Sequence, residues 1–291
     1  MEASPATRIR RLVIRGSHMN AIDTHIDLTA IKERQRWTWA SGDYSAIAAR
    51  IVPMAERLVE SARLRAGDAV LDVATGTGNA AIAAARCGCE VTGVDYVEAL
   101  LERGRERAAA EGLSVTFTEG DAEALPYPDA SFDAVLSCVG VMFTPDHEQA
   151  AAELVRVCRR GGTIALANWT PTGFVGAMFR TVSAHVPPPA GLRPPGLWGT
   201  EGHLRELLGT EVVDLTLTRR EFVFRFRSPT EFVEMFRVFY GPVRKAFDAL
   251  DEPGRDRLSL ELAALADEHD RELGRSIALP SEYIEAIATV R

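Results

Sequence analysis

The pattern with the clearest chemical meaning in this sequence runs from Val70 to Asn79, where an apolar stretch leads into two closely spaced glycines. Glycine at positions Gly76 and Gly78 allows a tight turn and lets a ligand approach the backbone without a Cβ atom in the way. The helix expected from Asn79 presents free N–H groups to a negatively charged ligand group. A strand, a Gly-x-Gly turn and a helix in this order indicate a nucleotide-type binding site.

Two interpretations of this site are open from the motif alone. Gly76-x-Gly78-x-x-Ala81, with Asp95 nineteen residues after the first glycine, fits a dinucleotide site in which the acid holds the adenosine ribose. Asp72, however, stands just before the turn, where a carboxylate has no use beside a pyrophosphate. It would instead attract a ligand with a cationic amine.

Over about residues 66 to 170 the chain resembles the class I S-adenosylmethionine-dependent methyltransferases. Asp72-x-x-x-Gly76-x-Gly78 is similar to the first motif of that family, in which the turn holds the methionine part of the cofactor and the acid lies near its ammonium group. Asp95, at the end of the second expected strand, matches the acid that binds both ribose hydroxyls. The resemblance implies S-adenosyl-L-methionine as cofactor and S-adenosyl-L-homocysteine as product.

A second part of the resemblance lies in Gly120 to Asp129 and the Ser131-Phe132-Asp133 that follows, which are similar to the family's third motif. It implies that Asp121 accepts a hydrogen bond from the adenine amino group and that Tyr96 lies against the adenine. The complete set of residues expected around the cofactor is Trp39, Tyr44, Asp72, Ala74, Thr75, Gly76, Gly78, Asp95, Tyr96, Asp121, Ala122, Glu123, Ser137 and Cys138.

The segment from Trp37 to Tyr44 resembles one that folds over the methionine end of the cofactor in the branch acting on quinones, sterols and secondary metabolites. Cation–π attraction between an aromatic ring and the sulfonium gives that placement a physical reason. Ser137 to Phe143 lacks the Asn/Asp-Pro-Pro-Tyr/Phe sequence of members that methylate nucleic-acid bases. The resemblance therefore implies methyl transfer to a small-molecule acceptor, mainly by positioning and desolvation. A nicotinamide-dependent oxidoreductase and a non-catalytic partner protein with a methyltransferase fold remain as alternatives.

A general base is needed only for some acceptors, and His147, His185 and His203 are the candidates by position in the chain. His147 follows the expected helix cap Asp146, which favours a surface position over a catalytic one. Glu153 and Arg156 lie three residues apart on one helix, and such a pair is usually solvated and of little energetic weight.

The elements that must position these residues alternate between short apolar stretches and amphipathic ones. Strands joined by single helices imply right-handed βαβ units and a parallel sheet. The fold predicted is α/β, a Rossmann-like doubly wound and mostly parallel seven-stranded sheet with helices on both faces. The strands expected are 69–74, 90–95, 114–118, 132–138, 163–169, strand or hairpin at 212–226, and 282–290. The helices expected are 79–86, 98–111, 146–159, 230–249 and 253–273.

The segments around this core divide residues 19–291, taken as one methyltransferase domain, into four parts. Residues 19–65 form an N-terminal helical cap with a break at Ser41-Gly42, and 66–170 form the cofactor-binding core. Residues 171–210 are Pro-rich and are expected as a lid that walls the acceptor pocket together with 37–44. Residues 211–291 are C-terminal strands and helices. Residues 1–18 look like the remnant of an expression tag and are excluded from the fold.

The charge and composition of the chain argue against several kinds of binding partner. The formal net charge is −8, which argues against binding a phosphate backbone, and residues 1–18 themselves carry a net positive charge. No apolar stretch has the length of a membrane span, and the spacing of the four cysteines matches neither a zinc site nor a disulfide framework. We therefore expect a cytoplasmic protein with no metal. The oligomeric state is open, a homodimer being one option.

Overall fold

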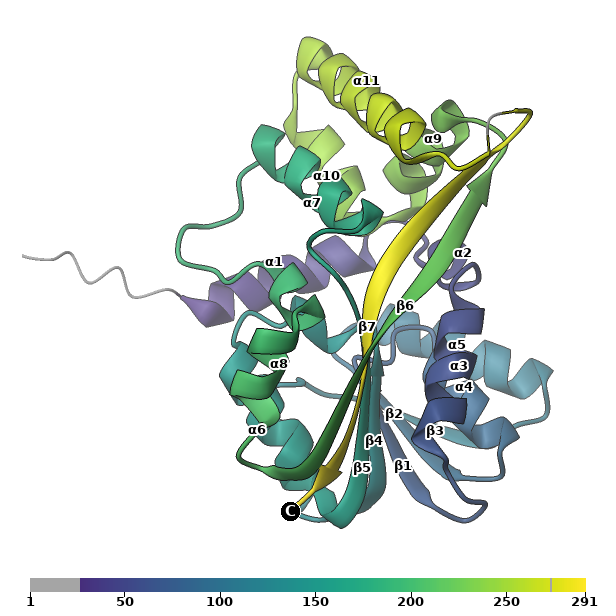
Figure 1. Cartoon of the computed structure of the whole chain (residues 1–291), viewed down its shortest axis with the longest axis vertical. Helices are drawn as coiled ribbons and strands as arrows, with labels where there is room; N and C mark the ends of the chain where they lie inside the picture. The colour runs from purple at the N-terminus through teal and green to yellow at the C-terminus, as the bar shows by residue number, and fades with distance from the viewer. Residues whose placement is uncertain (1–26, 273) are drawn as a thin grey trace, which may run out of the picture.

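The computed structural model describes residues 27–272 and 274–291 (Figure 1), so the expected tag remnant at 1–18 lies outside the described residues. Seven strands form one sheet in the order β3-β2-β1-β4-β5-β7-β6. The first five run parallel, whereas β7 is antiparallel to both β5 and β6. The strands are β1 (Ala69–Val73), β2 (Glu90–Asp95), β3 (Val115–Glu119), β4 (Phe132–Cys138), β5 (Cys158–Trp169), β6 (Val212–Phe226) and β7 (Ile277–Val290). The expected fold is confirmed.

Helices cover both faces of this sheet. On one side lie α3 (Val52–Ala62), α4 (Asn79–Arg86) and α5 (Glu98–Ala110), and on the other α6 (His147–Val157) and α8 (Glu201–Leu208). The apolar face of each helix is buried against the strands, and Ala80 to Ala84 of α4 are all buried. The core therefore extends along both faces of the sheet, as a doubly wound domain requires.

The remaining helices gather beyond the carboxyl ends of the parallel strands (Figure 1). They are α1 (Leu28–Ala40), α2 (Ser45–Ala48), α7 (Phe174–His185), α9 (Pro229–Phe239), α10 (Gly241–Ala249) and α11 (Glu252–His269). The short 3₁₀ helix η1 (Val141–Phe143) lies between β4 and α6, and η2 (Pro195–Gly199) lies between α7 and α8. In open α/β sheets, ligands bind at this edge. The cap helices therefore lie where they can enclose a ligand.

Several boundaries differ from the expectation: β5 and β7 each begin five residues earlier than expected, and α11 ends at His269 instead of 273. The strand or hairpin expected at 212–226 is a single long strand, which pairs with β7 from Phe226 to Val212. The helix expected at 230–249 is two helices, since Tyr240 is extended and Pro242 starts a new helix. The break lets Gly241 approach the backbone of α1 so closely that a Cβ atom would clash with the carbonyl oxygen of Thr38.

Candidate cofactor site

A cavity of about 840 Å³, partly open to solvent, lies at the carboxyl ends of β1, β2 and β4. It is formed by the turns after these strands, by the loop after β3 and by the N-terminal helices. Eleven of the fourteen residues expected around the cofactor line it: Trp39, Tyr44, Ala74, Thr75, Gly76, Asp95, Tyr96, Asp121, Ala122, Glu123 and Cys138. The fold thus brings together residues from five separate segments of the sequence.

The glycine turn between β1 and α4 adopts the left-handed conformation that glycine favours, with φ of +55° at Gly76 and +83° at Gly78. A Cβ atom on Gly78 would lie 2.9 Å from the ring of Phe117 on β3, so this position also needs glycine for packing. Gly78 is the N-terminal cap of α4 and does not line the cavity. Its role is to shape the turn, which leaves Gly76 facing the cavity.

Asp95 joins this turn to the end of β2. One carboxylate oxygen accepts a hydrogen bond from the backbone N–H of Gly76 and the other from that of Val97, both at 2.9 Å. The side chain lines the cavity although the residue is only 6% exposed, and this burial raises the pKa of its carboxyl group to about 6. Each carboxylate oxygen has a second lone pair, so Asp95 can still accept from a ligand hydroxyl.

Asp72 and Ser137 lie behind the turn instead of lining the cavity. One oxygen of Asp72 accepts from the Thr75 hydroxyl at 2.5 Å and from the Ala81 N–H at 2.9 Å, whereas its other oxygen, Oδ1, has no partner among the described residues. Burial raises the pKa of this carboxyl group to about 7. The Ser137 hydroxyl donates to the Val73 carbonyl and accepts from the Val141 N–H. Both residues brace the loops that line the cavity.

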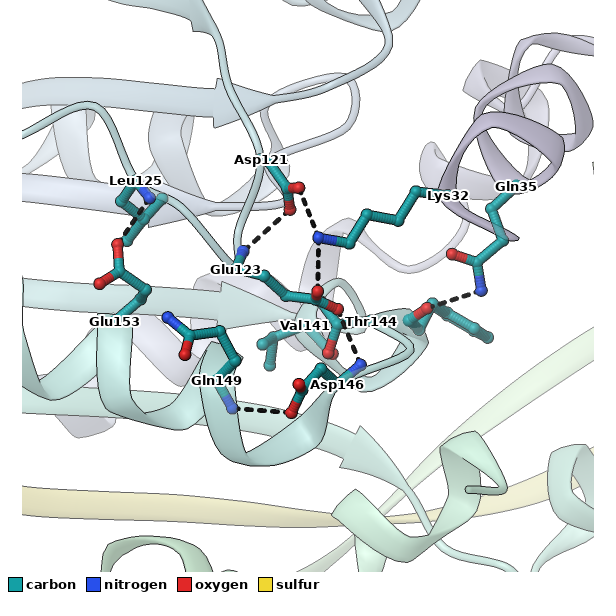
Figure 2. A network of polar contacts seen from close by, with 11 residues as sticks. Lys32, Gln35, Asp121, Glu123, Leu125, Val141, Thr144, Asp146, Gln149 and Glu153 are labelled. Atoms are coloured by element: carbon teal, nitrogen blue, oxygen red, sulfur yellow. Dashed lines mark hydrogen bonds and ion pairs between the residues drawn. The ribbon is translucent and has the colours of Figure 1, made fainter. Parts of the chain in front are cut away.

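Three polar side chains of α1 reach loops around the cavity, and the sequence analysis missed all three. Figure 2 shows the Lys32 ammonium group between two carboxylates, 2.7 Å from Asp121 and 2.5 Å from Glu123. Gln35 donates to the carbonyl oxygen of Phe143 at 3.1 Å, and Arg36 donates to that of Tyr96 at 2.5 Å. Positions 32, 35 and 36 share one helix face, and this spacing is the only feature of the sequence that could have indicated a common role.

Glu123 and Glu153 tie the loop after β3 to α6 (Figure 2). Glu123 accepts from the Asp146 N–H at 2.8 Å, and Asp146 in turn caps α6 through the Gln149 N–H. Glu153 accepts from the Leu125 N–H at 2.6 Å and pairs with Arg156 through both oxygens. Glu153 is only 7% exposed, so the expectation of a solvated pair is wrong. The buried carboxylate holds the loop that carries Asp121.

The three histidines proposed as bases do not line the cavity. His147 is fully buried instead of at the surface, because its side of α6 faces η2 and α8, where its Nδ1 lies 2.9 Å from Nε2 of His203. Burial, and then the neighbouring imidazole, lower the pKa of His147 to about 4. His185 pairs with Glu261 at 2.8 Å between α7 and α11. Their positions give no support to a catalytic role.

Residues 171–210 also differ from the expectation, since none of them lines the cavity. They form α7, η2 and α8, which pack against α11, against β5 and against α6. The segment reaches the site indirectly through Phe179, whose ring packs edge-on against Phe143 with centroids 6.0 Å apart. The other part of the expected wall, residues 37–44, does contribute to the cavity, through Trp39 and Tyr44.

Aromatic rings cluster around Trp39 beside the cavity. The Trp39 ring contacts the rings of Tyr44, Phe143 and Tyr240, with centroid distances of 5.6, 4.8 and 5.5 Å. Trp37, in contrast, is 76% exposed. Of the two tryptophans in the segment 37–44, only Trp39 therefore contributes to the site.

Comparison with known proteins agrees with this geometry. A family described as a methyltransferase domain matches residues 70–162, which span the glycine turn, Asp95 and the loop after β3. The chain belongs to the class I S-adenosylmethionine-dependent methyltransferases. This finding decides between the two interpretations of the glycine motif against the nicotinamide dinucleotide. The side chains present fit the cofactor, because the Asp95 carboxylate, an acceptor for hydroxyl groups, lines the cavity beside the Gly76 turn.

Individual relatives share different parts of the chain. An uncharacterized protein from Mycobacterium tuberculosis is 44% identical over 235 residues, which cover 77% of this chain and 86% of that protein. Demethylmenaquinone methyltransferase from Deinococcus radiodurans is 43% identical over 141 residues, which cover 47% of this chain and 58% of the enzyme. The structure of the YcgJ protein from Bacillus subtilis shares the fold, with a TM-score of 0.55, 19% identity and coverage of 81% of this chain and 97% of that one.

Residues 27–272 and 274–291 contain neither a membrane-spanning helix nor a cluster of metal ligands. No helix there is long and apolar enough to cross a membrane. Within the same ranges, no group of three or more histidine, cysteine or acidic side chains is arranged to hold a metal ion.

Proposed function

We propose that this methyltransferase acts on a neutral, largely apolar small molecule that contains a ring. The observation that supports this most is the separation of charge within the cavity. Its four charged lining residues are Lys32, Asp95, Asp121 and Glu123, and all of them lie on α1 or on the loops after β2 and β3. The other lining residues are uncharged, and the aromatic, aliphatic and small ones among them form the part that we call the uncharged end, including Trp39, Tyr44, Ile51, Val139, Gly140 and Phe143.

The charged end is the part suited to the cofactor. Asp95 would hold the ribose hydroxyls, and Asp121 with Tyr96 would hold the adenine. The Gly76 turn, with Asp72 behind it, would hold the methionine part. S-adenosylmethionine supplies an electrophilic methyl group on a sulfonium centre. An acceptor must then lie at the uncharged end, where a buried charge would have no partner and would be costly.

The lining of the uncharged end supports positioning and exclusion of water in preference to proton removal. Burial raises the pKa values of the Tyr44 phenol and the Cys138 thiol, so neither group is ionised near neutral pH. Histidine is absent from the described lining. Ordering two reactants in a dry, closed site lowers the barrier without a protein base.

Demethylmenaquinone methyltransferase, the named relative of the core, fits this proposal, because a demethylmenaquinone is a neutral ring compound. A cytoplasmic location and a preference against nucleic acid belong to the same proposal. They are supported by the formal charge of −8 and by four cysteines that are all free thiols. We also propose that residues 19–291 act as one domain. A measurement of mass in solution distinguishes a monomer from a homodimer.

The experiment compares matched acceptors. Hydroxylated naphthalenes and quinols are offered with S-adenosylmethionine, each beside an analogue that carries one added carboxylate, and S-adenosylhomocysteine release is measured. We expect turnover of the neutral compounds and a kcat/KM at least about tenfold lower for the charged analogues, equivalent to about 1.4 kcal/mol. Equal or better turnover of the carboxylates would contradict the proposal. S-adenosylmethionine binding without methyl transfer to any acceptor would favour the non-catalytic alternative.

A further inference from the structure

Helix α1 is attached to the rest of the protein in an unusual way. Of its thirteen residues only Ile31 is buried, whereas the neighbouring α3 buries five. The contacts that hold α1 over the cavity are therefore mainly polar. Lys32, Gln35 and Arg36 each reach a different loop, after β3, β4 and β2 respectively. A helix with so little apolar burial can leave its site at small cost, because most of its polar groups can bond to water instead.

The two ends of α1 are held differently. At the C-terminal end, Trp39 packs on Tyr240 and the backbone of Thr38 lies close to Gly241 of α10. In the N-terminal half, Ile31 is buried and the ammonium group of Lys32 bridges Asp121 and Glu123. This half therefore depends more on polar contacts than the C-terminal end of the helix does.

The ion pair of Lys32 joins this helix to the acids of the cofactor cavity. Both Asp121 oxygens are engaged, one by Lys32 and the other by the N–H of Glu123 at 2.9 Å. The Glu123 side chain is 3% exposed and also fixes the N-terminus of α6. Without the ammonium group, two carboxylates would face each other at the edge of a partly buried site. Lys32 thus neutralises the acids while it holds the helix in place.

We propose that α1 is a strap that must open for the cofactor to exchange, and that Lys32 is its latch and a positioning residue for Asp121. This inference rests on the proposed binding of S-adenosylmethionine in this cavity. Lys32, Gln35, Trp39 and Tyr44 all line the cavity, so a bound cofactor would be covered by the segment that carries them. Cofactor bound beneath the closed strap favours the closed state, since opening would expose its contacts to water.

Chemical labelling of amines provides the first test, because Lys32 and Lys245 are the only lysines among the 33 basic residues of the sequence. Lys245 is an exposed residue of α10 and lies 3.8 Å from Asp248, so it serves as an internal control. The unmodified protein is treated with an acetylating reagent, with and without S-adenosylhomocysteine, and labelling rates are read by peptide mass spectrometry. We expect the ligand to slow acetylation of Lys32 by about tenfold or more, and to leave Lys245 unchanged. An equal or faster rate at Lys32 would overturn the strap.

Dissociation kinetics provide the second test. Release of S-adenosylhomocysteine is followed by tryptophan fluorescence in wild type, Lys32→Met and the control Lys245→Met, at low and high salt. The latch is an ion pair of which Lys32 is partly exposed, so salt weakens it, and we expect faster release from the wild type as salt rises. Lys32→Met should release the ligand about tenfold faster and with a smaller dependence on salt, since only the Arg36–Glu119 ion pair of the helix remains, whereas Lys245→Met should match the wild type. A Lys32→Met variant with wild-type kinetics would refute the latch.

The assignment of the cavity to the cofactor and the opening of the strap give different results if they are wrong. If wild-type protein does not bind S-adenosylhomocysteine in a calorimetric titration, the assignment of the cavity fails. If it binds the ligand but neither the Lys32 labelling rate nor the Lys32→Met release rate behaves as expected, the cavity assignment stands and the strap fails. The labelling experiment needs no variant, so a folding defect in Lys32→Met cannot obscure the outcome.

Discussion

Replacing Glu153 with Gln tests whether the loop that carries Asp121 is fixed by a buried carboxylate. Glu153 accepts from the Leu125 N–H at 2.6 Å and binds Arg156 through both oxygens. Gln has the same shape but only one acceptor oxygen, so it can satisfy Leu125 or Arg156 but must turn its amide N–H₂ toward the other. The change therefore removes charge and one acceptor while leaving the packing intact.

The expected loss in the free energy of unfolding depends on how exposed the two partners of Glu153 are. A hydrogen bond to a charged group contributes about 1.5 to 3 kcal/mol, and the one from Leu125 is buried. The Arg156 side chain is 30% exposed and can bond to water after the change, so the pair itself adds less than about 1 kcal/mol. The total is about 2 to 3 kcal/mol, which lowers the melting temperature of a domain of this size by roughly 5 °C.

A matched control is present in the same chain. Glu234 and Arg237 have the same spacing and order, but their side chains are 53% and 48% exposed. Glu234→Gln should cost less than about 0.5 kcal/mol. Calorimetric melting and urea unfolding of both variants give the comparison, and titration with S-adenosylhomocysteine should show weaker binding only for Glu153→Gln. Equal stability losses in the two variants would show that burial of Glu153 has no energetic importance and refute the reasoning.

Three further predictions concern the cavity and the buried histidine. Asp95→Asn should weaken S-adenosylhomocysteine on the order of a hundredfold in calorimetric titration, because a charged acceptor of two hydroxyls is lost, and unchanged affinity would contradict the ribose assignment. Gly140→Ala should lower stability by about 1 to 3 kcal/mol and impair cofactor binding, since its Cβ atom would lie 2.5 Å from the Ala74 carbonyl oxygen, whereas Gly202→Ala, with open space around it, should be neutral or stabilising. The pKa of His147 is about 4 in the folded protein and near 6.5 when unfolded, so only the unfolded chain gains a proton between these values and stability falls as pH is lowered through this window. His147→Leu should therefore gain about 1 to 2 kcal/mol relative to wild type between pH 7.5 and pH 5 in urea unfolding, and a constant difference would show that His147 does not titrate in this way.

The core of the site could be predicted because its signals are local. The limits of α4 and β2 agree with the expected 79–86 and 90–95, since an Ala-rich helix and a buried strand are bounded by glycines and a turn. Asp95 then lies at the end of β2 by chain connectivity alone, and adjacent parallel strands bring it beside the Gly76 turn. The same reasoning could not separate Asp72, which lies behind the glycine turn, from Asp95, which lines the cavity.

Errors arose where a residue's environment is supplied by a distant segment. His147 follows a helix cap, which is typical of the surface, but α8 and η2 cover it from about fifty residues farther along the chain. Glu153 has the spacing of a solvated pair, yet it meets the backbone of Leu125 in another loop. Local spacing describes which residues share a helix face, but it contains no information about what covers that face.

By itself, the sequence determined the strands and helices of the cofactor-binding core, the glycine turn and the acids at the strand ends, because these depend on neighbouring residues and on the periodicity of burial. It also identified the family through motifs within residues 66 to 170. Only the tertiary structure decided which segment closes the cavity. Lys32 is 89 residues from Asp121, and the pairing depends on how α1 packs across three loops. Such long-range contacts are set by the packing of the whole domain, so the cover of the site is a property of the fold and not of any local pattern.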